Sequence, residues 1–149
     1  MVRCLIALTS LMTALVAIPQ GDDASKKDLD AMQGVWKVVE LTESGEKLLE
    51  KETEPVEVTI LANKMSIHDK GQFREEITLK LDAKAKVKAV DFVYTKGGNT
   101  GKTELGIYNL DGDKLTICMN ETKGGARPTE FTSTKANGCS VAVLKRVKK

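Results

Sequence analysis

The sequence predicts an all-β protein: an antiparallel up-and-down barrel of about eight strands, preceded by an export signal. Two observations indicate the barrel. Apolar and polar residues alternate with period two in several short runs, and turn-forming residues separate these runs about every 10–12 residues. In addition, no long amphipathic helix lies between the runs, which argues against a βαβ fold. One-sided alternation is typical of antiparallel strands with one face on a core and the other in water.

The first 21 residues differ in composition from the rest of the chain. Arg3 precedes the uncharged run Cys4–Ile18, which has 15 residues and is shorter than the roughly 20 needed to span a bilayer as a helix. This layout is typical of a secretory signal peptide, with an uncleaved anchor as the alternative. We therefore expect an exported protein, periplasmic or extracellular in a bacterium, without a stable membrane span after cleavage. Candidate cleavage points follow Ala17, Gly21 and Ala24.

The remainder divides into two parts. Residues 22–33 are polar and predict a linker that ends in a short helical turn, and residues 34–149 predict the barrel domain. The segment 43–54 has no clear pattern and is interpreted as a loop or a short helix that caps the barrel.

The clearest predicted strand is 73–81, in which Phe73, Ile77, Leu79 and Leu81 share one face. The same alternation predicts strands within 56–60, 65–67, 105–107 and 115–119. The sequence Asp111-Gly112-Asp113 between two apolar runs is a strong hairpin signal. The side chains expected to line the interior are Val38, Val56, Val58, Ile60, Ile77, Leu79, Val93, Leu105, Ile107, Ile117 and Val143.

Charge and aromatic content argue against a nucleic-acid partner. The chain has 23 basic and 21 acidic residues, a formal net charge of +2, and only one Trp, two Tyr and three Phe. A near-neutral chain lacks the electrostatic footprint of a nucleic-acid-binding protein, and so few aromatic side chains offer little surface for base stacking.

A family resemblance begins at Gly34-Val35-Trp36, which resembles the lipocalin signature at the start of the first strand. In lipocalins the Trp closes one end of the barrel and a basic residue near the end of the last strand packs across it; Arg146 is the matching residue here. Further segments resemble an uncharacterised lipocalin-like domain family abundant in planctomycete bacteria. These segments are 32–38, 88–92, 106–115, 127–131 and 143–146. The resemblance implies a barrel fold and no established activity.

The other residues of these motifs also have structural interpretations. We expect Tyr108 at a strand edge with its hydroxyl in water, and Asp111, Gly112 and Asp113 in a turn. Arg127 is expected to reach a carboxylate such as Glu130 or Asp91. Pro128 is expected to fix the start of a following strand, near Phe131.

Two cysteines, Cys118 and Cys139, remain once the leader is removed. An even number in an exported chain permits a disulfide, which would stabilise the fold by about 3 kcal/mol on the chain-entropy model. Strand parity places Cys118 outward, whereas Cys139 shares the parity of Val141, which is expected inward. Two unpaired thiols on neighbouring strands are the alternative.

Several motifs that suggest chemistry have simpler explanations. The run 97–103 resembles a phosphate-binding loop, but it lacks a glycine at 96 and lies between predicted strands, so we interpret it as a hairpin loop. Asn109, Asp111 and Asp113 alternate as calcium ligands do, but the glycine spacing is wrong for a calcium loop.

No catalytic constellation is evident either. His68 is the single histidine and is expected on a solvated strand face. Glu75 and Asp91 are carboxylates at nominally inward positions. A strand bulge, an open barrel end or a buried ion pair explains such positions more simply than acid–base catalysis does. We therefore predict no enzymatic activity, no metal and no cofactor.

The sequence thus favours a protein that binds a small apolar ligand inside the barrel or at its mouth. The alternative is a structural or protein-interaction module of the cell envelope, with a filled barrel and no ligand. The sequence leaves the oligomeric state open.

Overall fold

The computed structural model of the chain describes residues 22–49 and 56–148. The leader predicted at 1–21 lies outside the described residues, as does the part of the unassigned segment after Leu49. The earlier part of that segment is neither a loop nor a helix. It completes strand β1 and forms the short strand β2.

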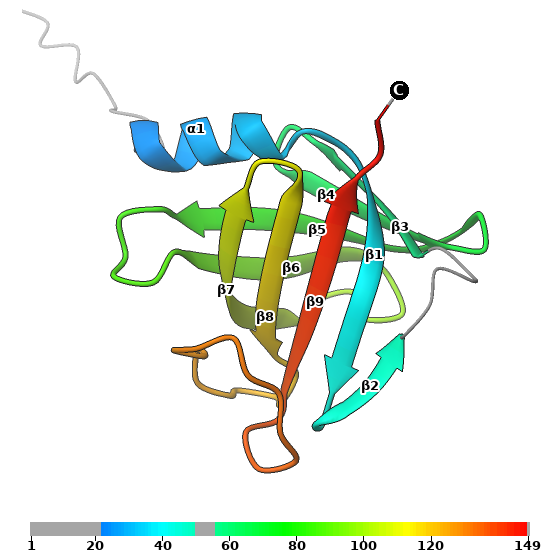
Figure 1. The fold of residues 1–149 in the computed structure, drawn as a ribbon, viewed down its shortest axis with the longest axis vertical. Helices are drawn as coiled ribbons and strands as arrows, with labels where there is room; N and C mark the ends of the chain where they lie inside the picture. The colour runs from blue at the N-terminus through cyan, green and yellow to red at the C-terminus, as the bar shows by residue number, and fades with distance from the viewer. Residues whose placement is uncertain (1–21, 50–55, 149) are drawn as a thin grey trace, which may run out of the picture.

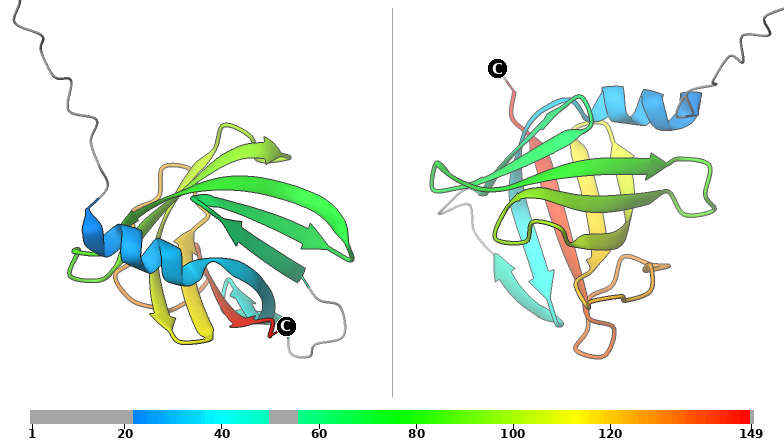
Figure 2. Two further views of the ribbon diagram at one scale, coloured as in Figure 1. Left: turned by 90° about the horizontal axis from the view of Figure 1, so that it is seen from above. Right: turned by 180° about the vertical axis from the view of Figure 1, so that it is seen from behind.

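The described strands form one antiparallel sheet that closes on itself (Figures 1 and 2). Each strand from β3 to β8 pairs with the next along the chain, and β1 pairs with both β3 and β9, so eight strands complete a barrel. β2 extends the sheet beside the C-terminal half of β1. The barrel predicted from the alternation pattern is confirmed. The strands are β1 Gly34–Glu43, β2 Glu46–Leu49, β3 Val56–Leu61, β4 Lys64–Asp69, β5 Gln72–Asp82, β6 Ala89–Gly97, β7 Thr103–Asp111, β8 Lys114–Asn120 and β9 Cys139–Arg146.

A helix, α1 (Asp23–Met32), lies across the end of the barrel at the top of Figure 1. Asp22 caps it, because its carboxylate accepts a hydrogen bond from the Ser25 backbone N–H at 2.9 Å. Met32 is buried at the C-terminal end, and Leu29 packs beside it against the core. The predicted linker is therefore wrong: most of this segment is a regular helix. In the part of the chain that the structure describes, no helix is both long and apolar enough to span a membrane.

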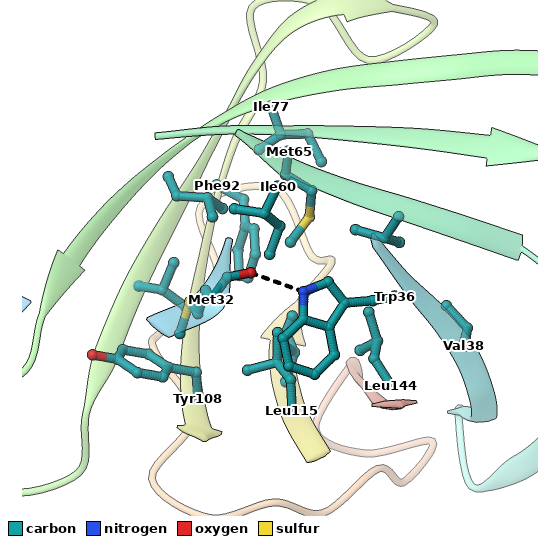
Figure 3. Packing of buried hydrophobic residues seen from close by; sticks show 14 of the residues in the cluster. Met32, Trp36, Val38, Ile60, Met65, Ile77, Phe92, Tyr108, Leu115 and Leu144 are labelled. Carbon is teal, nitrogen blue, oxygen red and sulfur yellow. Dashed lines mark hydrogen bonds between the residues drawn. The ribbon is translucent and has the colours of Figure 1, made fainter. Parts of the chain in front are cut away.

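The barrel interior holds one main apolar cluster, which gathers around Trp36, Phe92 and Leu115 (Figure 3). Gly106, in the middle of β7, has no room for a side chain. A Cβ at this position would lie only 2.7 Å from Cε2 of Phe92, so the absent side chain leaves room for the aromatic ring. The fully buried large side chains are Trp36, Phe92, Ile60, Ile77, Ile107, Leu115 and Leu144.

Strands β6, β7 and β9 turn the opposite face inward from the one predicted. In β7, Tyr108 belongs to the interior cluster, whereas Ile107 lies on the outer face in a second buried cluster with Cys118 and Cys139. The loop 121–138 covers this part of the outer face, so both faces of the strands carry apolar side chains and alternation does not identify the inner one. By the same alternation Val93, Leu105 and Val143 also face outward.

Two further predictions about individual segments need correction. Phe73 is 48% exposed, because the β4–β5 ladder shifts register between Ile67 and His68 and the inward face does not continue to the turn. No strand follows Pro128 either: residues 121–138 form a loop, and the next strand begins at Cys139.

Candidate functional site

The end of the barrel beneath α1 is closed by Trp36, whose side chain is fully buried. Its indole Nε1–H donates a 2.8 Å hydrogen bond to the carbonyl oxygen of Met32, the last residue of the helix (Figure 3). The guanidinium carbon of Arg146 lies 4.1 Å from the centroid of the Trp36 ring. This is the contact implied by the Gly-x-Trp pattern together with a basic residue in the last strand.

Arg146 also fastens this end of the barrel by hydrogen bonds. It donates to the carbonyl oxygens of Gln33 at 2.5 Å and Ala31 at 2.6 Å, and to the Asp113 carboxylate at 3.1 Å. Gly34 lies directly beneath: its φ of +117° is unfavourable for other residues, and a Cβ there would be 3.3 Å from Arg146 Nη1. Gly34, Trp36 and Arg146 therefore form a structural closure.

Tyr108 joins this closure, and the prediction that its hydroxyl lies in water is wrong. The side chain is 2% exposed, and its hydroxyl donates a 2.7 Å hydrogen bond to the Asp28 carboxylate on α1. Lys88 donates to the same carboxylate at 2.7 Å. Partial burial acts to raise the pKa of Asp28, but these two hydrogen bonds outweigh it and the pKa is lowered. Sequence reasoning missed this contact because it treated α1 as a linker.

The barrel centre next to this closure is packed. The space among Met32, Phe92, Tyr108, Leu115 and their neighbours is about 10 Å³, close to the least that holds one water molecule. The predicted lining residues Val58, Ile60, Ile77, Leu79 and Ile117 are core residues of this packed region.

A buried carboxylate lies farther along the interior, on β7. Glu104 is 4% exposed, accepts a 2.8 Å hydrogen bond from the Tyr94 hydroxyl and forms an ion pair with Lys102. Burial, and then the neighbouring Glu104, raise the pKa of Tyr94. Because its partners satisfy it, Glu104 has a structural role. The sequence carries no clear signal of this burial, because Glu104 stands between the polar residues 102–103 and the apolar run that begins at Leu105.

The two carboxylates considered for acid–base chemistry have separate partners. Glu75 accepts a 3.0 Å hydrogen bond from the Asn99 side chain in the β6–β7 turn. Asp91 lies on the outer face and pairs with Arg127 at 2.6 Å. The expectation that Asp91 points inward is wrong, and the structure does not bring Glu75 and Asp91 together as a catalytic pair.

A cleft with a volume of about 660 Å³ lies on the outside of the barrel. It separates the β5–β6 loop, residues 83–88, from the loop 121–138; both loops are on the left of the molecule in Figure 1, and Figure 2 shows them on one side from behind. Ala89 and Ile107 form its buried base. We call this space the lateral cleft. Its lining residues are Lys80, Leu81, Asp82, Ala85, Lys86, Val87, Ala89, Asp91, Ile107, Arg127, Pro128 and Thr129.

Arg127 builds one wall of the lateral cleft. Its Nη1 donates to the carbonyl oxygens of Val90 at 2.9 Å and Gly106 at 2.8 Å, and its Nη2 donates to Asp91. Of the two carboxylates predicted for it, Asp91 is the partner present. One side chain thus attaches the loop to both β6 and β7, which holds Pro128 in place at the cleft. Phe131, farther along the loop, is 37% exposed and does not line the cleft.

Cys118 and Cys139 both face outward beneath the same loop, so the predicted inward orientation of Cys139 is wrong. In this structure they are free, buried thiols. Cys118 Sγ lies 3.8 Å from the carbonyl oxygen of Thr132, and Cys139 Sγ lies 3.3 Å from that of Asn137. Burial, and then the adjacent Cys139, raise the pKa of Cys118 to about 11.

The remaining predicted residues occupy turns or surfaces. Asp111, Gly112 and Asp113 form the β7–β8 turn, where Gly112 has a φ of +54°. Asp113 pairs with Arg146 and Lys148. His68 packs edge-on against the ring of Phe73. Among the residues that the structure describes, no group of three or more His, Cys, Asp or Glu side chains is placed to hold a metal ion.

Comparisons of the chain with protein-family models, curated proteins and solved structures find no match.

Proposed function

We propose that this protein is an exported binding protein that takes up a small, largely apolar ligand in the lateral cleft. The observation that carries the proposal is the base of the cleft, where the apolar side chains of Ala89 and Ile107 meet a space of about 660 Å³. Small-molecule sites typically have volumes of about 300–1,000 Å³, with mostly apolar walls and a few fixed polar groups. Arg127, held by three hydrogen bonds, is such a fixed group.

The packed centre of the barrel favours the lateral cleft over the interior. A ligand among Trp36, Phe92 and Leu115 would have to displace side chains that already fill the space. Displacing well-packed core side chains costs several kcal/mol, whereas the lateral cleft is open without rearrangement. The barrel then serves as a rigid support for the two loops that form the site.

The chemistry of the lining favours binding over catalysis. The cleft lining contains no His, Cys or Ser, and its one arginine is already paired with Asp91. A nucleophile with an adjacent base is what acyl transfer or hydrolysis requires. The export part of the proposal rests on the signal-peptide pattern of residues 1–21.

A substitution that fills the cleft tests the proposal. Thr129 is exposed and lines the cleft, so Thr129→Trp adds bulk there without disturbing the core. Thr103→Trp is the matched control, because Thr103 is exposed on β7 outside the lining. We expect the neutral lipophile Nile red to bind the unaltered protein in a fluorescence titration, with the dissociation constant raised about tenfold by Thr129→Trp and unchanged by Thr103→Trp.

The competing function is a protein-interaction module of the envelope, which the packed barrel centre also suits. Absence of probe binding to the unaltered protein, or equal binding by both Trp variants, would contradict the ligand proposal. In either case the interaction module becomes the favoured function.

A further inference from the structure

We infer that the ligand of the lateral cleft is an organic anion with an aliphatic body, whose charged group is held by Lys80 and Lys86. This inference rests on the proposed function, because it specifies the ligand class for the same site. It follows from the charge balance of the lining and from the type of apolar side chain at the base.

Two of the five charged side chains of the cleft are paired with each other. Arg127 and Asp91 form an ion pair at 2.6 Å. The carboxylate of Asp82 accepts hydrogen bonds from the backbone N–H groups of Lys84 and Ala85 at 3.1 Å, so it stabilises its own turn. Asp82 keeps its negative charge, because neutral N–H groups do not cancel it, so the two lysines of the lining face one unpaired carboxylate.

Lys80 and Lys86 have no carboxylate partner among the residues that the structure describes, and both side chains are exposed at the cleft. Lys80 lies directly opposite Asp91 in the β5–β6 register, with Arg127 already bound to that carboxylate. One negative charge therefore faces two positive ones on the outer face. With Lys86 on the adjacent loop and Asp82 included, three positive and two negative side chains line the cleft, and an anionic ligand would complement the remaining positive charge.

The apolar part of the lining is aliphatic. Val87, Ala89, Ile107 and Pro128 contribute methyl, methylene and ring CH₂ groups, and no aromatic side chain lines the cleft. Such a surface gains free energy in proportion to the apolar area that it buries, without the stacking geometry that an aromatic ligand would use. A chain-like body terminated by a carboxylate fits both the base and the rim.

The lysine contribution is expected to be modest and sensitive to salt. Ion pairs with solvent-exposed lysines change affinity by about two- to fivefold each and are screened at high ionic strength. The aliphatic body would therefore supply most of the affinity, and the lysines would supply the selectivity for an anion.

Three ligands with the same ten-carbon body test the inference: decanoate, decanol and decylammonium. Decanoate and decylammonium are used below their micelle concentrations and decanol below its solubility limit, and binding is measured by calorimetry on residues 22–149. We expect decanoate to bind several-fold more tightly than decanol, and decylammonium most weakly. The preference for decanoate over decanol should shrink as salt is raised from about 0.05 to 0.5 M.

Matched lysine variants locate the charge recognition. Lys80→Gln with Lys86→Gln should reduce the preference for decanoate over decanol to about one, with decanol binding unchanged. Lys84→Gln is the control, because Lys84 is exposed in the same loop but does not line the cleft. It should leave the preference intact.

The outcomes separate this inference from the proposed function. If decanoate and decanol bind equally and Thr129→Trp weakens the binding of both, the lateral cleft remains the binding site, but the inference that its ligand is an anion is overturned. If decanoate is preferred but the double lysine variant retains the preference, the assignment to Lys80 and Lys86 is overturned. If none of the three ligands binds but Nile red does, the inference fails and the proposed function stands; if Nile red does not bind either, both fail.

Discussion

Arg146 and Trp36 are direct partners across the β1–β9 pairing, and the guanidinium carbon lies 4.1 Å from the centroid of the indole ring. The contact joins the first and last strands of the barrel at the point where the sheet closes. The same arginine binds backbone oxygens at the end of α1. One pair of side chains therefore contributes both to barrel closure and to helix docking.

Trp36→Ala is expected to lower the free energy of unfolding by about 3–5 kcal/mol, because it leaves a large cavity and removes the base on which Arg146 packs. Trp36 is the only tryptophan, so denaturant unfolding should be followed by circular dichroism instead of intrinsic fluorescence. The exposed-site substitution Lys37→Ala on the same strand serves as the control. An unchanged unfolding midpoint for Trp36→Ala would contradict the closure role.

Tyr108 and Asp28 should be energetically coupled. Tyr108→Phe and Asp28→Asn are each expected to destabilise the protein by about 1–2 kcal/mol, since each removes or weakens a hydrogen bond to a charged group. The double variant should destabilise by less than the sum of the two. A double-mutant cycle measured by denaturant unfolding gives the coupling energy directly, and strictly additive effects would refute a direct bond between α1 and the barrel.

Arg127→Met is expected to loosen the loop 121–138 without unfolding the barrel. The substitution removes two hydrogen bonds to backbone oxygens and one ion pair, and we expect a loss of about 1–2 kcal/mol because the side chain is only partly buried. Hydrogen exchange should accelerate in this loop and not in β3 or β4. Uniform acceleration throughout the barrel would mean that Arg127 supports the whole fold instead of the cleft wall.

Cys118 should be slow to react with iodoacetamide at pH 8. Its pKa is raised from 9.0 to about 11, so the folded protein retains the thiol proton at pH values where the unfolded chain has lost it. Because the folded protein holds this proton more tightly than the unfolded chain, the Cys118 thiol contributes to the free energy of unfolding. This contribution is fully present below pH 9 and is lost as the pH rises from 9 to 11.

Alkylation measured by mass spectrometry between pH 8 and pH 11 checks this prediction, with protein unfolded in urea as the control. A folded-state rate that already equals the unfolded rate at pH 8 would contradict it. Arg127→Met should raise the folded-state rate, because the loop that it loosens covers both thiols.

The Trp36–Arg146 contact was predicted from the resemblance of Gly34-Val35-Trp36 to the lipocalin signature, which implies a basic partner near the end of the last strand. The pairing of β1 with β9 brings these two residues together. The turn at Asp111-Gly112 was predictable because a local backbone conformation selects its residues.

The orientation of Tyr108 and Ile107 could not be predicted from alternation. An alternation with period two identifies the inner face of a strand only where the outer face is polar. On β7 the outer face also carries a buried apolar side chain, because the loop 121–138 covers it. Tertiary contacts determine which face of β7 points inward. The ring of Phe92 packs where Gly106 has no side chain, and the hydroxyl of Tyr108 donates a hydrogen bond to Asp28. Neither requirement is visible in a short window of sequence.

The lateral cleft was equally invisible in the sequence. Its walls come from two loops far apart in the chain, and the position of one depends on Arg127 reaching carbonyl oxygens of β6 and β7. The sequence suggested Asp91 as one of two candidate partners of Arg127, but its alternation pattern placed Asp91 inside the barrel. A site on the outer face was therefore not considered.

The cap of α1 bears on the export signal that we propose for residues 1–21. Asp22 accepts the Ser25 N–H, and the Ser25 hydroxyl in turn accepts the backbone N–H of Ala83, beside the lateral cleft. Cleavage of such a signal after Ala17 or Gly21 would keep this chain of hydrogen bonds, whereas cleavage after Ala24 would remove Asp22 together with the first two residues of α1. The position of the proposed cleavage would thus determine whether α1 keeps its N-cap.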